Sequence, residues 1–401
     1  MKELIERIKD LSAAYFDDIV AIRRHLHMHP ELSKQEHRTA SFISEKLTEM
    51  GIPHQKGIAG TGVVGLIEGR GGSGRVIALR ADMDALPIME ENKVPYRSQT
   101  PGVMHACGHD VHMSCLLGAA RILNELRDEW SGQVKLIFQP AEETAPGGAK
   151  LMIEAGVLEN PAPEYVFGQH VFVPLPAGKV GIRSGQYMAS ADEVYLHVKG
   201  KGGHAATPHL NVDPIVIASH IVVALQTIVS RAAKASMPSV LSFGKMIGEG
   251  RTNIIPGEVK LEGTFRTFNE EWRAEALQRI ADMAKGVARG MGGDCEVHII
   301  KGYPFLVNDN QLADAFRLHA SAYLGAGNVE ELDLAMTAED FAFFSQKRPS
   351  CFYRLGISHP ETGPGSNLHT PTFDIDERAL ETGMGLMAYL AVASTAASHR
   401  E

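Results

Sequence analysis

Apolar side chains recur with helical spacing in the first part of the chain, and short apolar runs follow them. Spacings of three and four positions predict amphipathic helices over residues 3–28 and 39–50, ended by Pro30 and Gly51. Short β-rich runs predict strands, and longer periodic runs predict further helices. The predicted strands cover residues 62–68, 75–80, 133–138, 165–168 and 352–355, and the further helices cover 110–126 and 148–155. This alternation indicates an α/β fold with a mostly parallel sheet that is covered by helices on both faces.

The order of elements changes near residue 188. Strands are predicted over residues 192–198, 240–248, 259–268 and 295–301, and helices over 213–231 and 270–290. This β-α-β-β-α-β order is typical of a ferredoxin-like module. The chain then returns to mixed α/β segments. We therefore predict one domain made of residues 1–187 and 303–401, interrupted by an inserted α+β domain over residues 188–302.

The predicted helix over residues 213–231 is apolar around much of its circumference. Its apolar positions include Ile215, Val216, Ile217, Ile221, Val222, Val223, Leu225 and Ile228. Such a helix is usually buried on more than one side. It is short for a membrane span and contains His220 and Gln226. We therefore expect it to form a contact between domains or a dimer interface rather than to cross a membrane.

The net charge, the first residues and the cysteine count limit which partners and which cellular compartment we expect. The net charge of -9 argues against a nucleic-acid partner, because phosphate binding requires a basic surface. The first residues have no apolar core of the signal-peptide type. Only 4 cysteines are scattered over 401 residues, which fits a reducing compartment without disulfides. We expect a cytoplasmic protein with no membrane partner.

Acidic, imidazole and thiol side chains follow the ends of the predicted strands. These residues are Asp82 and Asp84, Glu142 and Glu143, His170, His369, and the motif MHACGHD at residues 104–110. Because ligands of parallel sheets bind at the carboxyl ends of the strands, we expect these side chains to converge at one edge. Thiolate, imidazole and carboxylate are the ligands of a metal centre. Of Glu142 and Glu143, one can bind metal while the other takes a proton from water.

The motifs together identify a family. The chain resembles the aminoacylase-like dinuclear metallohydrolases, in the branch of hippurate hydrolases, bacterial N-acyl-amino-acid amidohydrolases and plant auxin-conjugate hydrolases. The matching stretches lie between residues 23 and about 376 and read RRHLHMHPEL, ALRADMDALP, MHACGHDVHMS, FQPAEE, GKGGHAATPH, NIIP, GTFRT, MTAEDFAFF and LHTPTFD. The resemblance implies a zinc-peptidase-like catalytic domain with an inserted lid or dimerisation domain. It also implies a homodimer, or a dimer-based homo-oligomer, that assembles through the inserted domain and hydrolyses the amide bond of N-acyl-L-amino acids.

The resemblance further implies a role for individual residues. It implies two divalent metals per subunit, zinc or manganese, with nickel and cobalt as alternatives. The implied metal ligands are Cys107, His109, Glu143, His170 and His369, and Glu142 is the implied general base and acid. His204 would polarise the scissile carbonyl from the partner subunit, and Asn253 and Arg266 would bind the substrate's carboxylate or a nearby oxygen. Asp84 would orient a metal ligand without binding metal, and Asp82 has no assigned role as a ligand.

Other interpretations of the same residues remain open. A dipeptidase or carboxypeptidase would differ from an amidohydrolase only in its acyl pocket. A cysteine hydrolase could use Cys107 and His109, but it would leave the glutamates and the other histidines unexplained. A binding protein without activity is a third alternative. We expect structural roles for His25, His27, His29, His105, Cys115, Cys295 and Cys351, and we assign no role to His209, Glu339 and Asp340. We expect His112, which lies inside a helix, either to support a metal ligand or to pack.

Overall fold

The computed structural model describes residues 2–396, which form two compact units. Unit 1 contains the residues up to Gly185, Val307–Asp333, and those from Asp340 onward. Unit 2 contains Gln186–Leu306 and Leu334–Glu339. Leu334–Glu339 was not predicted to belong to the insert. This segment is too short for a hydrophobic pattern of its own, and it joins unit 2 through a parallel bridge between Met188 and Ala335.

Unit 1 is built on an eight-stranded sheet with the order β1-β2-β4-β3-β5-β16-β6-β15. Its strands are β1 (His54–Ile58), β2 (Gly62–Glu68), β3 (Val76–Asp82), β4 (Gln133–Gln139), β5 (Tyr165–Pro176), β6 (Val180–Ile182), β15 (Val329–Glu331) and β16 (Ser350–Ser358). The four central strands β4, β3, β5 and β16 run parallel. The residues of β3, β4 and β16 are almost all buried, as are residues 166–171 of β5, as expected for strands covered on both faces. The predicted mostly parallel α/β sheet is confirmed.

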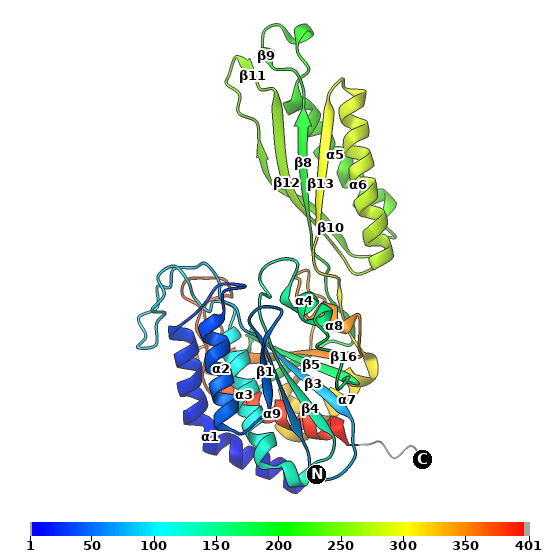
Figure 1. Ribbon diagram of the computed structural model, residues 1–401. Helices are drawn as coiled ribbons and strands as arrows, with labels where there is room; N and C mark the ends of the chain where they lie inside the picture. Colours follow the sequence, from blue (N-terminus) through cyan, green and yellow to red (C-terminus); the bar gives the residue numbers. More distant parts are fainter. Residues whose placement is uncertain (1, 397–401) are drawn as a thin grey trace. The chain divides into compact units, whose positions relative to one another are not determined.

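Helices cover both faces of this sheet. They are α1 (Lys2–Met28), α2 (His37–Glu49), α3 (His109–Glu125), α4 (Gly148–Glu154), α7 (Asn310–Leu324), α8 (Ala342–Ser345) and α9 (Ala379–Thr395). The crossover through α3 leads from β3 to β4, and the crossover through α4 leads back across β3 to β5. Because such crossovers are right-handed, α3 and α4 lie on opposite faces (Figure 1). The reversal brings the carboxyl ends of β3, β4 and β5 around one point, where α/β proteins bind ligands.

Helix α3 is the inner helix of its layer. It contacts β3, β5, α1 and α9, and almost all of its residues are buried. Gly118 lets α9 approach closely, because a Cβ at this position would lie 2.7 Å from the sulfur of Met384. The start of α3 is therefore held in place by packing on several sides.

Unit 2 has a four-stranded antiparallel sheet with the order β10-β12-β8-β13. Its elements are β8 (Asp192–Lys199), β9 (Gly203–His204), α5 (Pro214–Thr227), β10 (Ser239–Ile247), β11 (Ile254–Ile255), β12 (Glu258–Thr267), α6 (Glu270–Gly290) and β13 (Asp294–Lys301). The strands β7 (Gly185–Met188) and β14 (Leu306–Asn308) lie where the chain passes between the units. The main elements of unit 2 follow the predicted β-α-β-β-α-β order.

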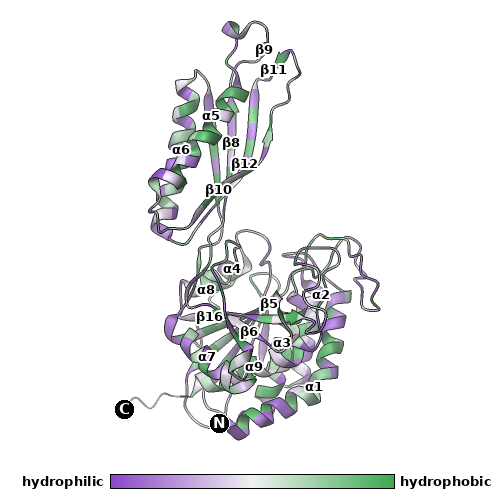
Figure 2. Cartoon of the chain, turned by 180° about the vertical axis from the view of Figure 1, so that it is seen from behind, coloured by the Kyte–Doolittle hydropathy of each residue, from purple (hydrophilic) through white to green (hydrophobic). Residues whose placement is uncertain are grey.

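Helix α5 is apolar on its outer side as well as its inner side (Figure 2). Ile217, Ile221 and Leu225 are buried in the core of unit 2, whereas Val216 and Val223 are 43% and 71% exposed. The segment Pro214–Ala232 is long and apolar enough to cross a membrane by length and composition alone. The same apolar surface would equally suit a contact with another protein chain.

Candidate metal centre

Cys107 lies at the centre of a group of metal-ligand side chains. Its Sγ is 3.5 Å from Nε2 of His170 and 3.3 Å from Nε2 of His369. Within each of three overlapping groups, the ligand atoms lie within 4.8 Å of one another. These groups are Cys107 with His109 and His170, Cys107 with Glu143 and His369, and His109 with Glu142 and Glu143. The structure thus brings together all five predicted metal ligands and the predicted general base.

Different elements deliver these side chains. Cys107 precedes α3, where Gly108 adopts the left-handed conformation with φ 79°, and Glu142 and Glu143 follow β4. His369 comes from a loop that is tied to the start of α3, because its N–H donates to the carbonyl of Ala106 at 2.8 Å. His170 was predicted to follow a strand that ended at residue 168. This prediction is wrong, because β5 continues to Pro176 and pairs with β16 beyond His170.

Two of the imidazoles are oriented toward the group by hydrogen bonds to carbonyls. His109 Nδ1 lies 2.7 Å from the carbonyl oxygen of Asp84, and His170 Nδ1 lies 2.8 Å from that of Val171. A carbonyl can only accept, so each Nδ1 carries the proton. Each Nε2 then presents its lone pair to the group, which is the arrangement that a metal-binding histidine requires.

Two polar atoms at the centre are buried without a hydrogen bond. Within residues 2–396, neither Nε2 of His109 nor Oε1 of Glu143 has a hydrogen-bond partner. These atoms lie 3.9 Å from each other. Buried polar atoms almost always have a hydrogen-bond partner. An imidazole lone pair and a carboxylate oxygen that lack one here would both suit a bound cation.

The pKa shifts of the ligand side chains also favour a bound cation. Burial and the nearby Glu143 carboxylate raise the pKa of the Cys107 thiol. The Cys107 thiol, 3.3 Å from Nε2 of His369, and the Glu143 carboxylate, 3.4 Å from it, raise the pKa of His369 to about 10. Burial lowers the pKa of His170, which keeps that imidazole neutral and able to bind metal. The group therefore favours positive charge, and a metal cation can replace the protons that it would otherwise hold.

The two aspartates at the end of β3 and just after it bind neighbouring protein groups. The carboxylate of Asp84 accepts hydrogen bonds from the backbone N–H groups of Glu142 and Glu143, each at 3.0 Å, and from Ser33 Oγ at 2.6 Å. Asp82 lies 2.6 Å from Nη1 of Arg80 and 2.5 Å from Nδ1 of His112. Asp84 thus holds the backbone of both glutamates, whereas Asp82, which also lies within 4.8 Å of His109 and His112, remains close enough to take part in a metal site.

The Asp82–His112 pair was not predicted from the sequence. Both ring nitrogens of His112 are occupied. Nδ1 faces the carboxylate of Asp82, and Nε2 accepts the N–H of Val171 at 2.9 Å, so His112 has no free lone pair. Val171 follows His170 in β5, so the pair fixes the strand that carries this ligand. His112 lies three residues after His109 in α3, but nothing in the local sequence indicates its partner.

Comparison with known proteins assigns the chain to a family. The sequence profile of peptidase family M20/M25/M40 matches residues 78–393. The chain belongs to this family. The resemblance seen in the motifs is confirmed, and so are the predicted fold class and the prediction of a metal-dependent hydrolase that acts on amide bonds.

Relatives of this M20 family member cover three quarters of it or more. An N-acyl-L-amino acid amidohydrolase of Geobacillus stearothermophilus is 44% identical over 76% of this chain and 81% of the relative. Thermostable carboxypeptidase 2 of Saccharolobus solfataricus is 38% identical over 97% of this chain and 98% of the relative. The crystal structure of the YXEP protein of Bacillus subtilis, a dinuclear metal binding peptidase from the M20 family, is 35% identical with a TM-score of 0.81. It covers 95% of this chain and 98% of its own. Together with the three ligand groups, this likeness supports two divalent metals.

The predicted substrate-contacting residues of this M20 family member lie in unit 2, and the structure does not bring all of them together. His204 and Asn253 are neighbours, because β9 pairs with β11 and the N–H of Ala205 donates to the carbonyl of Asn253. β9 and β11 extend the β8–β12 pair past the Glu258 end of β12, whereas Arg266 lies near the other end (Figure 1). Eight residues of strand between 258 and 266 span roughly 26 Å. One small substrate cannot contact both ends within one chain.

His204 is exposed, and a backbone N–H determines which of its ring nitrogens can donate. Its Nδ1 accepts the N–H of Ala206 at 3.1 Å. The ring proton therefore lies on Nε2, which can donate a hydrogen bond to an oxygen. Arg266 is half-buried, and its Nη1 donates to the carbonyl of Met336 at 2.9 Å. Among the described residues it has no ion-pair partner, so most of its five N–H donors are available to a carboxylate.

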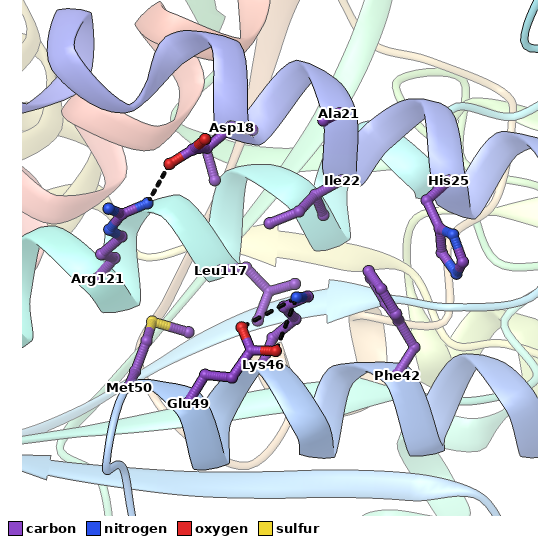
Figure 3. A pocket seen from close by; sticks show the side chains of 11 residues that line it. Asp18, Ala21, Ile22, His25, Phe42, Lys46, Glu49, Met50, Leu117 and Arg121 are labelled. Carbon is purple, nitrogen blue, oxygen red and sulfur yellow. Dashed lines mark hydrogen bonds and ion pairs between the residues drawn. The ribbon is translucent and has the colours of Figure 1, made fainter.

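A separate pocket of about 600 Å³ in unit 1 contains none of the predicted site residues. It lies among α1, α2 and α3 (Figure 3), and His25 stacks on Phe42 at its edge with ring centroids 4.2 Å apart. Its acidic and basic side chains pair with one another, namely Asp18 with Arg121 and Lys46 with Glu49. His25 therefore has a packing contact here, as expected of a structural histidine.

His27 belongs to a buried ionic network behind the start of α3. Arg23 Nε lies 2.8 Å from Oδ2 of Asp110, and His27 Nδ1 lies 2.8 Å from the same oxygen. The side chains of Arg23 and Asp110 are fully buried. Because Asp110 follows His109 directly, this network anchors the turn that carries Cys107 and His109.

Proposed function

We propose that this protein is a metal-dependent amidohydrolase that cleaves N-acyl-L-amino acids into a carboxylic acid and a free amino acid. The observation that carries the proposal is the convergence of Cys107, His109, Glu142, Glu143, His170 and His369 at one edge of the sheet. Relatives with this activity in their names support it, including the amidohydrolase of Geobacillus stearothermophilus and an N-acetylcysteine deacetylase of Bacillus subtilis.

In the proposed mechanism, Cys107, His109, Glu143, His170 and His369 hold two divalent metals. When bound, these metals supply Lewis acidity that lowers the pKa of the attacking water and polarises the scissile carbonyl. Glu142 takes a proton from that water as it attacks the acyl carbon, and then gives the proton to the departing amine. The amide C–N bond breaks, and one water is consumed for each acid and amine released.

The residues of unit 2 act on the other parts of the substrate. His204 donates from Nε2 to the developing oxyanion, with Asn253 beside it. Arg266 holds the free carboxylate through parallel hydrogen bonds, which its planar guanidinium suits. Since Arg266 lies at the far end of β12 from His204 and Asn253, we infer that these groups reach one substrate from two different chains.

A homodimer provides the second chain. We infer that the second chain covers two surfaces of unit 2. These are the exposed apolar side of α5 and the edge strand β10. Val223 is 71% exposed on α5, and Met246 and Ile247 of β10 are 45% and 41% exposed. Surfaces of this kind are costly in a monomer, and an edge strand is a ready template for pairing.

The metal is proposed to be zinc or manganese, with nickel and cobalt as alternatives. A thiolate ligand favours zinc among these ions. The proposed location is the cytoplasm, which the four unpaired cysteines support because a reducing compartment keeps thiols free.

The carboxylate contact is tested by comparing an N-acetyl amino acid with the same compound carrying a carboxamide. Removing charge-assisted hydrogen bonds of about 1.5–3 kcal/mol should lower kcat/KM on the carboxamide by roughly 10- to 100-fold. In Arg266→Met the two compounds should be hydrolysed at similar, low rates. Arg279→Met, an exposed arginine of α6, serves as the control and should keep the preference. Equal rates on both compounds with the unaltered protein would contradict the carboxylate contact.

A peptidase acting on a free carboxyl end is the second candidate. Thermostable carboxypeptidase 2 of Saccharolobus solfataricus shares 38% identity over nearly the whole chain. The same assay decides between the two if dipeptides are included. Faster hydrolysis of dipeptides than of any N-acyl amino acid would favour the peptidase.

A further inference from the structure

Three consecutive backbone N–H groups, which include that of the predicted general base Glu142, donate to two buried carboxylates. The N–H of Ala141 donates to Oε1 of Glu36 at 2.8 Å. The N–H groups of Glu142 and Glu143 donate to the two oxygens of Asp84, each at 3.0 Å. The segment that carries both glutamates is thus held at its backbone, in addition to any contact that the glutamate side chains make.

The turn at Ala141 requires such support. Its φ of 52° lies in the left-handed region, which residues other than glycine rarely adopt. On the other side of the turn, the carbonyl of Ala141 accepts the N–H of Gly148 at 2.9 Å. This approach is open only to glycine, because a Cβ at position 148 would lie 1.6 Å from the carbonyl oxygen of Pro140. The turn sets the direction in which Glu142 leaves β4.

Glu36 is itself rigidly placed. It is fully buried directly before α2, and its Oε1 also accepts the N–H of Lys34 at 2.9 Å. Its Oε2 accepts the hydroxyl of Thr61 at 2.7 Å. Both oxygens are occupied by protein donors, and Glu36 is absent from the groups of described residues that could hold a metal. Its contact with the reaction centre therefore runs through the backbone of Ala141.

We propose that Glu36 is a positioning residue, whose carboxylate holds the left-handed turn at Ala141 and thereby directs Glu142 and Glu143 toward the metal centre. The proposal rests on the proposed function for the role of Glu142, but not for the placement of Glu143 as a ligand. Without this acceptor, the N–H of Ala141 is buried and unpaired, and the turn can relax. Displacements of about 1 Å at a reacting group can cost on the order of 100-fold in rate.

The test compares Glu36→Ala with Glu36→Gln in the metal-loaded, full-length protein. In the glutamine variant, the amide oxygen can still accept from Ala141 and Lys34, and the NH2 group can donate to Thr61. Glu36→Ala should lower kcat about 10- to 100-fold with little change in KM, and should weaken zinc binding by a similar factor in competition with a chelator. Glu36→Gln should retain most of both properties.

Glu31→Ala is the matched control. The Glu31 carboxylate also accepts a backbone N–H at the start of α2, from Thr39 at 2.9 Å, but it does not contact Ala141. The control should keep kcat and zinc affinity even if its thermal stability falls. If Glu36→Ala does not fold, Glu36→Asp replaces it, because the shorter side chain moves the acceptor by about 1.5 Å.

The proposal is overturned if Glu36→Ala is folded and keeps both the kcat and the zinc affinity of the unaltered protein. It is also overturned if Glu31→Ala or Glu36→Gln is as impaired as Glu36→Ala. If the unaltered protein hydrolyses no N-acyl amino acid, the proposed function fails. The comparison of zinc affinities then still decides whether Glu36 positions the ligand Glu143.

Discussion

Glu142→Gln is expected to hydrolyse N-acyl amino acids roughly 100- to 10,000-fold more slowly than the unaltered protein, while binding the same amount of metal. Glutamine keeps the size of the side chain but cannot take a proton from water at neutral pH. The backbone N–H of Glu142 would still donate to Asp84, and the N–H of Asp340, 3.4 Å from Oε1, would still meet an oxygen acceptor. Steady-state kinetics and measurement of bound metal on the same sample separate the two properties.

The control for this prediction is Glu154→Gln, which changes an exposed glutamate in α4. It should leave both the rate and the metal content unchanged. Full activity in Glu142→Gln would show that another group is the general base. A loss of metal in that variant would instead make Glu142 a ligand, and Glu143 would become the remaining candidate for the base.

Arg23→Met is expected to lower the free energy of unfolding by roughly 3–5 kcal/mol, the usual cost of leaving a buried charge without its partner. Burial opposes the ionised form of Asp110, but Arg23 and then His27 hold its pKa well below the usual range. Without Arg23, His27 would be the one ion-pair partner left to this fully buried carboxylate within the described residues. Urea unfolding followed by circular dichroism measures the loss.

The neighbouring arginine provides the matched control. Arg24 pairs with Glu377 at 2.6 Å, but its side chain is 43% exposed. Arg24→Met should therefore cost less than about 1 kcal/mol, as is usual for exposed ion pairs. Equal losses in the two variants would mean that the buried network does not stabilise the protein in the way that its geometry implies.

The convergence of the proposed metal ligands could be predicted because their signals are local. Glu142 and Glu143 follow closely after the buried strand β4, and Cys107 and His109 lie at the start of a helix whose apolar pattern is clear. Parallel strands place such residues at one edge regardless of the details of packing. The position of His170 was less well predicted, because pairing with β16 extends β5 to Pro176 and outweighs the local preference for a strand end.

The supporting residues could not be predicted in the same way. Glu36 meets Ala141 across 105 positions of sequence, and His112 meets Asp82 across 30. Neither residue has a neighbour that indicates its partner. The separation of Arg266 from His204 and Asn253 follows from the register of β12 with β8 and from the β9–β11 pair beyond it. A strand pattern fixes which face a residue occupies, but not which partner lies opposite.

Metal titration of the chelator-treated protein tests the metal-dependent hydrolysis most directly. Bound zinc or manganese and the release of amino acid from an N-acyl amino acid are followed in the same samples. We expect no hydrolysis without metal, activity that rises as metal binds, and a plateau at two ions per chain, with Cys107→Ser binding less metal. Full hydrolysis by the metal-free protein, abolished when the Cys107 thiol is alkylated, would contradict the metal centre and identify a cysteine hydrolase.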